Sequence, residues 1–289
     1  MFPASFDYVA AHSVEEALTA KGEGGDDVRF LAGGQSLIPM MKTRLATPAV
    51  LVDINGVPGL DTLERANGHL RVGALVRHAD VAASDLTFGA VRSAAPWISD
   101  PLVRNRGTLC GSVAHCDPEG DWNSVLLATG AKVIARGSSG ERAIPITEFI
   151  VDFFGNALAD DEMVTAVHIP VPSGRAGGSY QKLERKVGDY ATAAVAAHLE
   201  LAVDGTIVRA GLALTAVNPV NTKVTAAEAM LVGEQPTTEV FMAAGELAAQ
   251  AAEPRDDVRG SAEWKRNVVR VFTRRALAAA AEEAGAGTH

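Results

Sequence analysis

Cysteine is scarce in this sequence, and that limits the redox and metal chemistry that the chain can carry. Cys110 and Cys116 are the only cysteines in 289 residues. Their spacing matches neither a CxxC redox pair nor a zinc or iron–sulfur ligand set. We expect both thiols to be buried, as free cysteines usually are. We expect no metal ion and no iron–sulfur cluster bound to this chain.

Long apolar runs and an excess of positive charge are also missing. No apolar run approaches the ~20 residues that cross a bilayer. The first residues lack the basic and apolar segments of a signal peptide, so we expect a cytoplasmic protein. The formal net charge of −9 disfavours nucleic-acid binding, which depends on neutralising phosphates. Neither GxGxxG nor the Walker A pattern occurs, which disfavours a Rossmann NAD site and a P-loop NTPase.

The expected elements follow an α+β order. In the first part of the chain, Ser13 and Glu16 form a capping box that opens a helix, and short strands are expected near residues 28–32 and 49–54. The second part mixes strands and helices around a polar, glycine-containing loop at residues 100–121.

The last part of the chain is expected to follow a flexible linker at residues 173–178, which are rich in glycine. Two long strands flank Asp204-Gly205, a strong hairpin signal. Three helices are then expected, at residues 224–231, 238–252 and 263–284.

Ala32-Gly33-Gly34-Gln35-Ser36 lies between an expected strand and an expected helix at residues 37–45. Consecutive glycines permit a positive φ and leave no Cβ to keep a phosphate from the backbone. Backbone N–H groups of such a turn, with those of the following helix, can bind an anion. Taken alone, the same residues fit a plain turn equally well.

Two further polar segments follow one another. Residues 103–112 contain two arginines, two glycines and two hydroxyl groups, which could bind a second phosphate or a polyol, or could form a solvated basic loop. Residues 115–121 contain His115, Cys116 and three carboxylates, but their spacing fits no tetrahedral metal site. Asp121 is better suited to accept hydrogen bonds from a polyol, and His115 to be an ordinary loop histidine.

The fourth segment, residues 180–191, alternates like an exposed strand at a sheet edge. Its Lys182 could stabilise negative charge on a reduced ring cofactor, and a tyrosine could stack against the ring. Considered alone, it is an ordinary charged strand.

Together the four segments resemble the FAD-binding medium subunits of the xanthine-oxidase family of molybdenum hydroxylases, most closely that of aerobic carbon monoxide dehydrogenase. The resemblance covers nearly the whole chain and is most characteristic in residues 31–39, 41–46 and 185–194. It implies a two-lobed FAD-binding domain of the PCMH (vanillyl-alcohol-oxidase-like) type, with subdomains at residues 1–56 and 57–172. A C-terminal α+β domain with an antiparallel sheet and helices, residues 173–289, would follow.

The resemblance also implies that FAD is bound non-covalently and that no side chain of this subunit is catalytic. Residues 32–36 would bind the pyrophosphate and a second loop would lie on the phosphate side, while Asp121 would bind the ribityl hydroxyls. Lys182 and Tyr190 would lie by the isoalloxazine. The implied FAD-binding residues are Ala32, Gly33, Gly34, Gln35, Ser36, Leu37, Val103, Thr108, Gly111, Ser112, Asp121, Leu158, Val164, Lys182 and Tyr190.

Two residues depart from the family pattern. Cys110 stands where the second loop usually has glycine, so either that loop is displaced or Cys110 points away from FAD. Gln35 stands where the carbon monoxide enzyme often has histidine, although glutamine is common in the wider family.

The partners implied are a large subunit with molybdopterin cytosine dinucleotide and a small subunit with two [2Fe–2S] clusters, in a dimer of heterotrimers. Through this complex the chain would contact the inner membrane only peripherally. Electrons would pass from the clusters through FAD to an external acceptor, with carbon monoxide as substrate and a quinone as acceptor. The alternatives are a purine or N-heterocycle hydroxylase (xanthine, caffeine or nicotine type), a scaffold subunit without cofactor, and a self-sufficient flavin oxidase.

Overall fold

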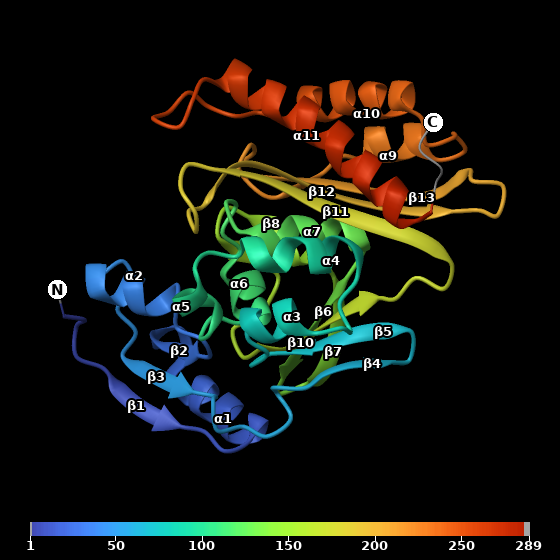
Figure 1. Cartoon of the computed structure of the whole chain (residues 1–289). Coiled ribbons are helices and arrows are strands. Elements are labelled where there is room, and N and C mark those ends of the chain that lie inside the picture. Colours follow the sequence, from blue (N-terminus) through green and yellow to red (C-terminus); the bar gives the residue numbers. More distant parts are fainter. Residues whose placement is uncertain (1, 286–289) are drawn as a thin grey trace.

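A small parallel sheet forms the N-terminal lobe of the computed structural model, which describes residues 2–285. Its strands lie in the order β1 (Asp7–Ala10), β3 (Val50–Asp53), β2 (Val28–Leu31). Helix α1 (Val14–Gly24) and the 3₁₀ turn η1 (Gly25–Asp27) connect β1 to β2, and α2 (Leu37–Thr43) follows β2. The lobe lies at one end of the molecule (Figure 1).

The cap of α1 differs from the predicted capping box in one bond. The Ser13 hydroxyl accepts a hydrogen bond from the Glu16 N–H at 3.0 Å, as predicted. The Glu16 carboxylate, however, accepts from the N–H of His12 at 2.8 Å rather than from that of Ser13.

An antiparallel sheet forms the second lobe, in the strand order β4 (Leu63–Ala66), β5 (His69–Gly73), β10 (Met163–Pro170), β6 (Lys132–Gly137), β7 (Gly140–Pro145). A two-stranded hairpin, β8 (Ile150–Asp152) and β9 (Gly155–Asn156), extends from it. Its helical segments are α3 (His78–Ala83), α4 (Gly89–Ala94), η2 (Ala95–Trp97), α5 (Pro101–Arg104), α6 (Leu109–His115), α7 (Asp121–Thr129) and α8 (Ile146–Phe149).

The single loop predicted for residues 100–121 was wrong, because this stretch contains α5 and α6. Asp100 begins α5 with a side-chain hydrogen bond from the Val103 N–H at 2.9 Å. Thr108 begins α6 in the same way, accepting from the Gly111 N–H at 3.1 Å. Both residues are good helix N-caps, and their caps stabilise helices too short for a periodic apolar pattern to reveal.

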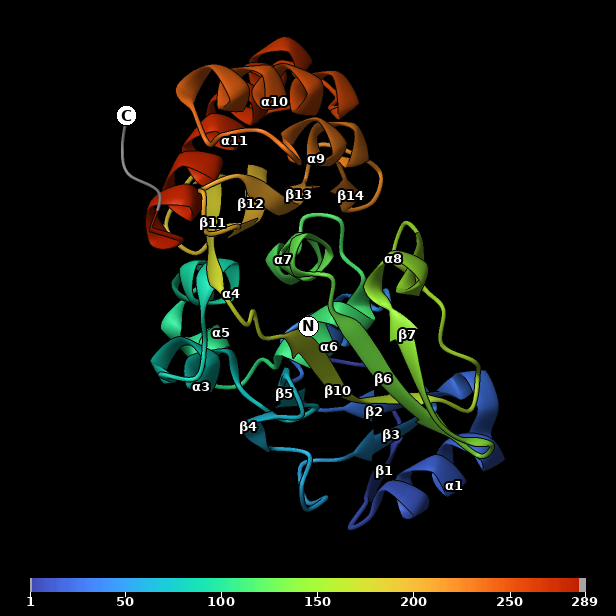
Figure 2. The same ribbon diagram turned by 90° about the vertical axis from the view of Figure 1, so that its right-hand side faces the viewer.

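A second antiparallel sheet forms the C-terminal part, in the order β11 (Arg175–Glu184), β12 (Ala191–Leu201), β13 (Ile207–Thr215), β14 (Thr222–Lys223). The hairpin predicted at Asp204-Gly205 connects β12 to β13. Helices α9 (Thr225–Leu231), α10 (Thr238–Ala251) and α11 (Ala262–Glu283) lie on one side of this sheet, and α4 and α7 lie on the other (Figures 1 and 2).

The linker predicted at residues 173–178 was wrong for its last four residues, since β11 begins at Arg175. Gly177 and Gly178 serve close packing instead of flexibility. A Cβ on Gly177 would lie 2.1 Å from the carbonyl oxygen of Ala280 in α11, and one on Gly178 would lie 2.5 Å from the N of Ala90 in α4. The two helices therefore pack directly on the backbone of β11.

Residues 180–191 were predicted to form an exposed strand at a sheet edge. The edge position is confirmed for β11, but the predicted exposure was wrong. β11 is the outer strand of its sheet, yet Tyr180 and Lys182 are buried. The sequence alternation could not reveal this, because α4 and α7 come from an earlier part of the chain and cover that face.

Two apolar clusters hold these layers together. One runs through the first two lobes and around Trp122, which is fully buried, and the other lies between the C-terminal sheet and α9 to α11. Both cysteines are buried, as predicted. No helix within residues 2–285 is both long and apolar enough to cross a membrane.

Gly211 provides a test of the packing between α7 and β13. A Cβ at this position would lie 1.8 Å from the carbonyl oxygen of Ala128. We expect Gly211→Ala to reduce the free energy of unfolding by about 3 kcal/mol, because the helix must move away from the strand. Urea unfolding measures this. Gly174→Ala, where a Cβ would meet nothing within 4 Å, is the control, and equal stability of the two variants would contradict the packing described.

Candidate functional site

A cavity of about 1130 Å³ lies where the N-terminal lobe, the second lobe and the C-terminal sheet meet. Its volume exceeds that of most small-molecule pockets and suits a dinucleotide-sized ligand. Every residue of the predicted FAD-binding set lines it, from Ala32 to Tyr190. The structure therefore brings the four sequence segments together, while their individual contacts with FAD stay a prediction.

The Ala32–Ser36 turn owes its shape to glycine. Gly34 has a φ of 71°, in the left-handed region that favours glycine. A Cβ on Gly33 would lie 2.4 Å from the carbonyl oxygen of Arg106 and 2.6 Å from the Cα of Gly107. The first glycine turn thus lies against the backbone of the second loop, and only glycine at position 33 allows this approach.

Asn55 and Arg77 join these two loops from behind, in an arrangement that we call the loop clasp. The Asn55 amide donates to the carbonyl oxygen of Ala32 at 2.9 Å. Arg77 donates one hydrogen bond to the Asn55 side-chain oxygen at 2.6 Å and another to the carbonyl oxygen of Arg106 at 2.7 Å. The Arg77 guanidinium, together with Asn55, therefore holds the two loops at a fixed distance from each other.

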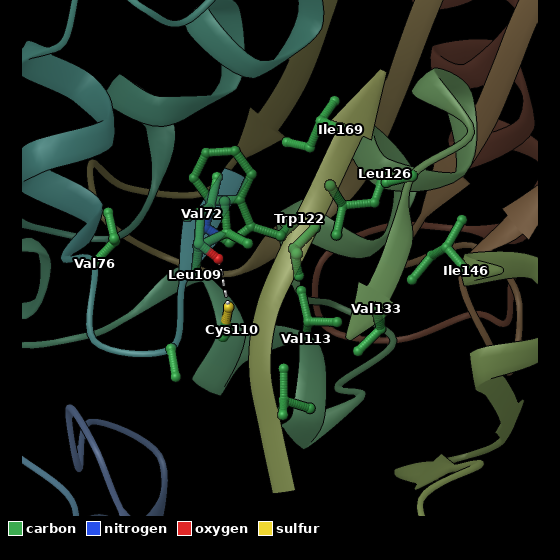
Figure 3. Packing of buried hydrophobic residues seen from close by; sticks show 14 of the residues in the cluster. Val72, Val76, Leu109, Cys110, Val113, Trp122, Leu126, Val133, Ile146 and Ile169 are labelled. Carbon is green, nitrogen blue, oxygen red and sulfur yellow. Dashed lines mark hydrogen bonds between the residues drawn. The ribbon is translucent and has the colours of Figure 1, made fainter. Parts of the chain in front are cut away.

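The second loop leads into α6. The buried Thr108 hydroxyl accepts from the Gly111 N–H, and a Cβ on Gly111 would lie 2.6 Å from that hydroxyl oxygen. Cys110 points into the apolar core, where its Sγ donates to the carbonyl oxygen of Val72 at 3.3 Å (Figure 3). Burial raises the pKa of this thiol to about 12. The Cys110 thiol is therefore turned into the core, although the residue also lines the cavity, and the expectation that it points away from FAD stays a prediction.

A buried polar cluster closes the cavity beside the C-terminal sheet. Asp121, the first residue of α7, accepts from the Tyr180 hydroxyl at 2.5 Å and from Lys182 Nζ at 3.0 Å. Lys182 also donates to the carbonyl oxygen of Trp97 at 3.0 Å and lies 3.5 Å from the Glu184 carboxylate. Burial raises the pKa of Asp121, although the Lys182 charge and the Tyr180 hydrogen bond oppose the shift.

Tyr190 lines the cavity and remains half exposed. Burial of its hydroxyl, followed by the negative charge of Asp117, raises its pKa to about 12, so it is a neutral phenol. Arg259 holds the surrounding loops, donating to Glu119 at 2.9 Å and to the carbonyl oxygen of Ala191 at 3.3 Å.

The polar segment at residues 115–121 shows no metal arrangement. His115 packs its ring against Phe154 at a centroid distance of 5.0 Å. Within residues 2–285, no group of three or more histidine, cysteine and carboxylate side chains is placed to hold a metal ion.

Sequence reasoning missed the roles of four residues that shape the cavity: Asn55, Arg77, His78 and Tyr180. Asn55-Gly56 fits a turn that ends a strand, and Arg77 and His78 fit an ordinary helix start. Tyr180 lay within a singled-out segment, but nothing in the sequence paired it with Asp121, 59 positions earlier. No local signal marks such partners, because they meet only in the folded chain.

Family models match almost the whole chain. Residues 4–172 match the FAD binding domain in molybdopterin dehydrogenase, and residues 178–280 match the CO dehydrogenase flavoprotein C-terminal domain. The chain belongs to this FAD-binding family. It is the FAD-binding medium subunit of an oxidoreductase of the molybdenum hydroxylase family, with the PCMH-type fold that the resemblance implied.

Individual relatives agree with this assignment. The chain is 37% identical to the 6-hydroxypseudooxynicotine dehydrogenase complex subunit alpha of Paenarthrobacter nicotinovorans, over 98% of this chain and 97% of that one. It is 35% identical to the carbon monoxide dehydrogenase medium chain of Hydrogenophaga pseudoflava, over 97% and 98%.

Solved structures of relatives have the same fold. Carbon monoxide dehydrogenase from Hydrogenophaga pseudoflava superposes with a TM-score of 0.94 at 36% identity, covering 98% of this chain and 99% of that one. Quinoline 2-oxidoreductase from Pseudomonas putida 86 gives a TM-score of 0.87 at 31% identity, covering 99% of each chain.

The cavity of this family member suits FAD on structural grounds. Gly33 and Gly34 leave the backbone open along one wall, as close approach of a pyrophosphate requires. The buried cluster of Asp121, Tyr180 and Lys182 supplies hydrogen-bonding groups along another. Apolar lining residues such as Leu158 and Val164 suit a flat ring.

The loop clasp is testable through FAD affinity. We expect Arg77→Met to raise the dissociation constant of FAD about 10-fold, since loss of two hydrogen bonds from one guanidinium lets the glycine loops separate. Titration of the deflavinated protein measures this. Arg65→Met removes a comparable bond, to the carbonyl oxygen of Leu86, outside the cavity. If the two variants bind FAD equally well, the clasp has no role.

His78 predicts how stability depends on pH. Burial, reinforced by the charges of Arg104 and Arg77, lowers its pKa from 6.5 to about 4. Between these values the unfolded chain binds the proton and the folded chain does not, so stability falls as pH drops from 6.5 to 4. The contribution is about 3 kcal/mol.

The measurement is urea unfolding of the isolated chain at a series of pH values. In His78→Phe the loss of stability over this window should be smaller by that amount, whereas the exposed His12→Gln should leave it unchanged. Parallel pH profiles for His78→Phe and the parent chain would contradict the assignment.

Proposed function

We propose that this subunit holds FAD across the cavity and relays electrons through it, from iron–sulfur clusters of a small partner subunit to an external acceptor. The observation that carries the proposal is the convergence of all four polar segments on one cavity, with the two glycine loops in contact. Bound flavin supplies the chemistry, because it can take up electrons singly and release them in pairs. The chain itself binds, orients and shields.

The two glycine loops would bind the pyrophosphate. Residues 32–36 would offer backbone N–H groups, and Thr108 and Ser112 would offer hydroxyl groups, along one side of the cavity that Val103 and Gly111 also line. The N–H groups of Val103, Gly111 and Ser112 already donate within the second loop and α6. No buried cation of the described residues is needed there, since oriented N–H groups attract an anion. The loop clasp would set their spacing.

The buried cluster would serve the other end of the cofactor. Both Asp121 oxygens already accept hydrogen bonds, but each carboxylate oxygen has two lone pairs and can accept another from a ribityl hydroxyl. Lys182, whose side chain is only 1% exposed, would place a positive charge near the ring that gains negative charge on reduction. Tyr190 would stack on the ring from the open side.

The partners proposed are a large subunit with molybdopterin cytosine dinucleotide and a small subunit with two [2Fe–2S] clusters, assembled as a dimer of heterotrimers. The names of the relatives support the subunit relation, because several are medium chains or medium subunits. Peripheral contact of the complex with the inner membrane is part of the same proposal.

For the substrate we propose carbon monoxide, oxidised by the large subunit with water to carbon dioxide, two protons and two electrons, with a quinone as acceptor. The TM-scores of 0.94 and 0.93 to carbon monoxide dehydrogenases support it. A second candidate is an N-heterocycle hydroxylase. The 37% identity to the 6-hydroxypseudooxynicotine enzyme and 36% to a nicotine 6-hydroxylase subunit favour that reading.

The test is an absorbance spectrum of the purified complex, followed by anaerobic addition of substrates. We expect flavin absorbance bands that bleach when carbon monoxide is added. Bleaching with a purine, caffeine or nicotine, and not with carbon monoxide, would identify an N-heterocycle hydroxylase instead. Bleaching of the isolated chain would favour a self-sufficient oxidase. If no flavin bands appear, even after FAD is added to the complex, the chain would be a scaffold subunit without cofactor.

The variant Gly33→Ala tests whether the flavin of the complex is bound in this cavity. Its Cβ would lie 2.4 Å from the carbonyl oxygen of Arg106 and force the glycine loops apart, so we expect the complex to be purified without flavin. Gly22→Ala, in α1 with nothing within 4 Å of the added Cβ, should retain it. Full flavin content in Gly33→Ala would argue against the proposed pyrophosphate site.

A further inference from the structure

The ring of His78 is buried in the wall of the cavity, and one of its nitrogens is already bonded. Trp122 Nε1 donates a hydrogen bond to His78 Nδ1 at 3.1 Å. The ring centroids are 6.1 Å apart and the ring planes are inclined by 26°, so the two rings meet edge to edge at this bond. Trp122 is fully buried, so the histidine ring has little freedom to turn.

This bond fixes the tautomer of the imidazole. The indole N–H is a donor and never an acceptor, so Nδ1 must carry a lone pair. In a neutral imidazole the proton is then on Nε2. Burial and the nearby charges of Arg104 and Arg77 disfavour a second proton on the ring. At neutral pH His78 is therefore an uncharged ring with its single N–H at Nε2.

The Nε2 edge lies beside the second glycine loop. The backbone N–H of His78 donates to the carbonyl oxygen of Gly107 at 3.0 Å. A Cβ on Gly107 would lie 2.8 Å from His78 Cδ2 and 2.9 Å from Nε2. Gly107 in turn lies against Gly33, so the ring borders the meeting point of both glycine loops.

Nε2 has no hydrogen-bond partner within the described part of the chain, residues 2–285, although the ring is only 4% exposed and lines the cavity. Nε2 is not among the fully enclosed polar atoms that lack a partner, so a molecule in the cavity can reach it. A ligand that covered this N–H without accepting from it would leave a buried donor unpaired, at a cost of about 1–3 kcal/mol. A bound molecule with an oxygen acceptor at this point of the cavity would satisfy it.

We propose that His78 is a cofactor-contacting residue whose Nε2–H donates a hydrogen bond to an oxygen of FAD in its pyrophosphate–ribityl chain. Trp122 is the positioning residue that holds the imidazole in the donating tautomer. The inference rests on the proposed function, since it requires FAD in the cavity. It adds a neutral donor to the backbone N–H groups and hydroxyls of the two loops.

The experiment is an FAD titration of the deflavinated full-length protein. His78→Phe keeps a ring and removes both nitrogens, and we expect its dissociation constant for FAD to rise about 10-fold. His78→Gln retains an N–H donor and should recover part of the affinity. Trp122→Phe, which frees the tautomer, should weaken binding less than His78→Phe. His168→Phe, a half-buried histidine outside the cavity, is the matched control and should bind as the parent chain does.

Nitrogen-15 NMR of the imidazole gives a readout independent of folding defects in a variant. We expect the Nε2–H tautomer in the parent chain, and a shift of its Nε2 signal when FAD is added. A proton on Nδ1, an Nε2 signal unaffected by FAD, or parental FAD affinity in His78→Phe would each overturn the inference. Failure of the parent chain to bind FAD at all would instead overturn the proposed function.

Fragments of the cofactor identify the acceptor. If His78→Phe weakens ADP binding but not riboflavin binding, the oxygen belongs to the pyrophosphate. If it weakens riboflavin binding alone, the oxygen belongs to the ribityl chain. Equal binding of both fragments by parent and variant would contradict the proposed hydrogen bond.

Discussion

The close approach of Gly33 to Gly107 is the contact on which the cavity depends. A single added Cβ at position 33 would meet the backbone of the second loop at 2.4 Å, so the two loops share one surface only while that position is glycine. Side chains outside the cavity maintain this contact: the Asn55 amide binds the first loop, and Arg77 binds both Asn55 and the second. The wall proposed to face the pyrophosphate is thus left to backbone atoms, which are small and include N–H donors.

The C-terminal sheet contributes to the same cavity through buried charge. Lys182 comes from β11 and Asp121 from the start of α7, and their contact joins a late strand to an early helix. A buried pair of this kind gives little net stability, because removing both charges from water opposes their attraction. The Asp121–Lys182 pair is better explained by where it lies than by stability. It holds the Lys182 ammonium group at the cavity wall, next to the place proposed for the flavin ring.

The sequence was informative where chemistry is local and silent where partners are distant. The glycine turn, the hairpin at Asp204-Gly205 and the order of strands and helices each depend on neighbours within a few residues, and the structure contains them. The linker at residues 173–178 failed because glycines that suit a flexible segment equally suit a strand under two helices. Burial of Lys182 and the bonding of His78 to Trp122 depend on side chains far apart in the chain, which no local pattern encodes.

Cys110 illustrates how a departure from a family pattern can leave a binding wall intact. A helix presents successive side chains in different directions, so the first residues of α6 do not all face the cavity. The thiol of Cys110 enters the core and donates to the carbonyl oxygen of Val72 (Figure 3). The room needed beside Thr108 is provided by Gly111. The requirement for glycine therefore applies at position 111, where a Cβ would meet the capping hydroxyl at 2.6 Å, and is absent at position 110. The side chain at position 110 is therefore accommodated by the core.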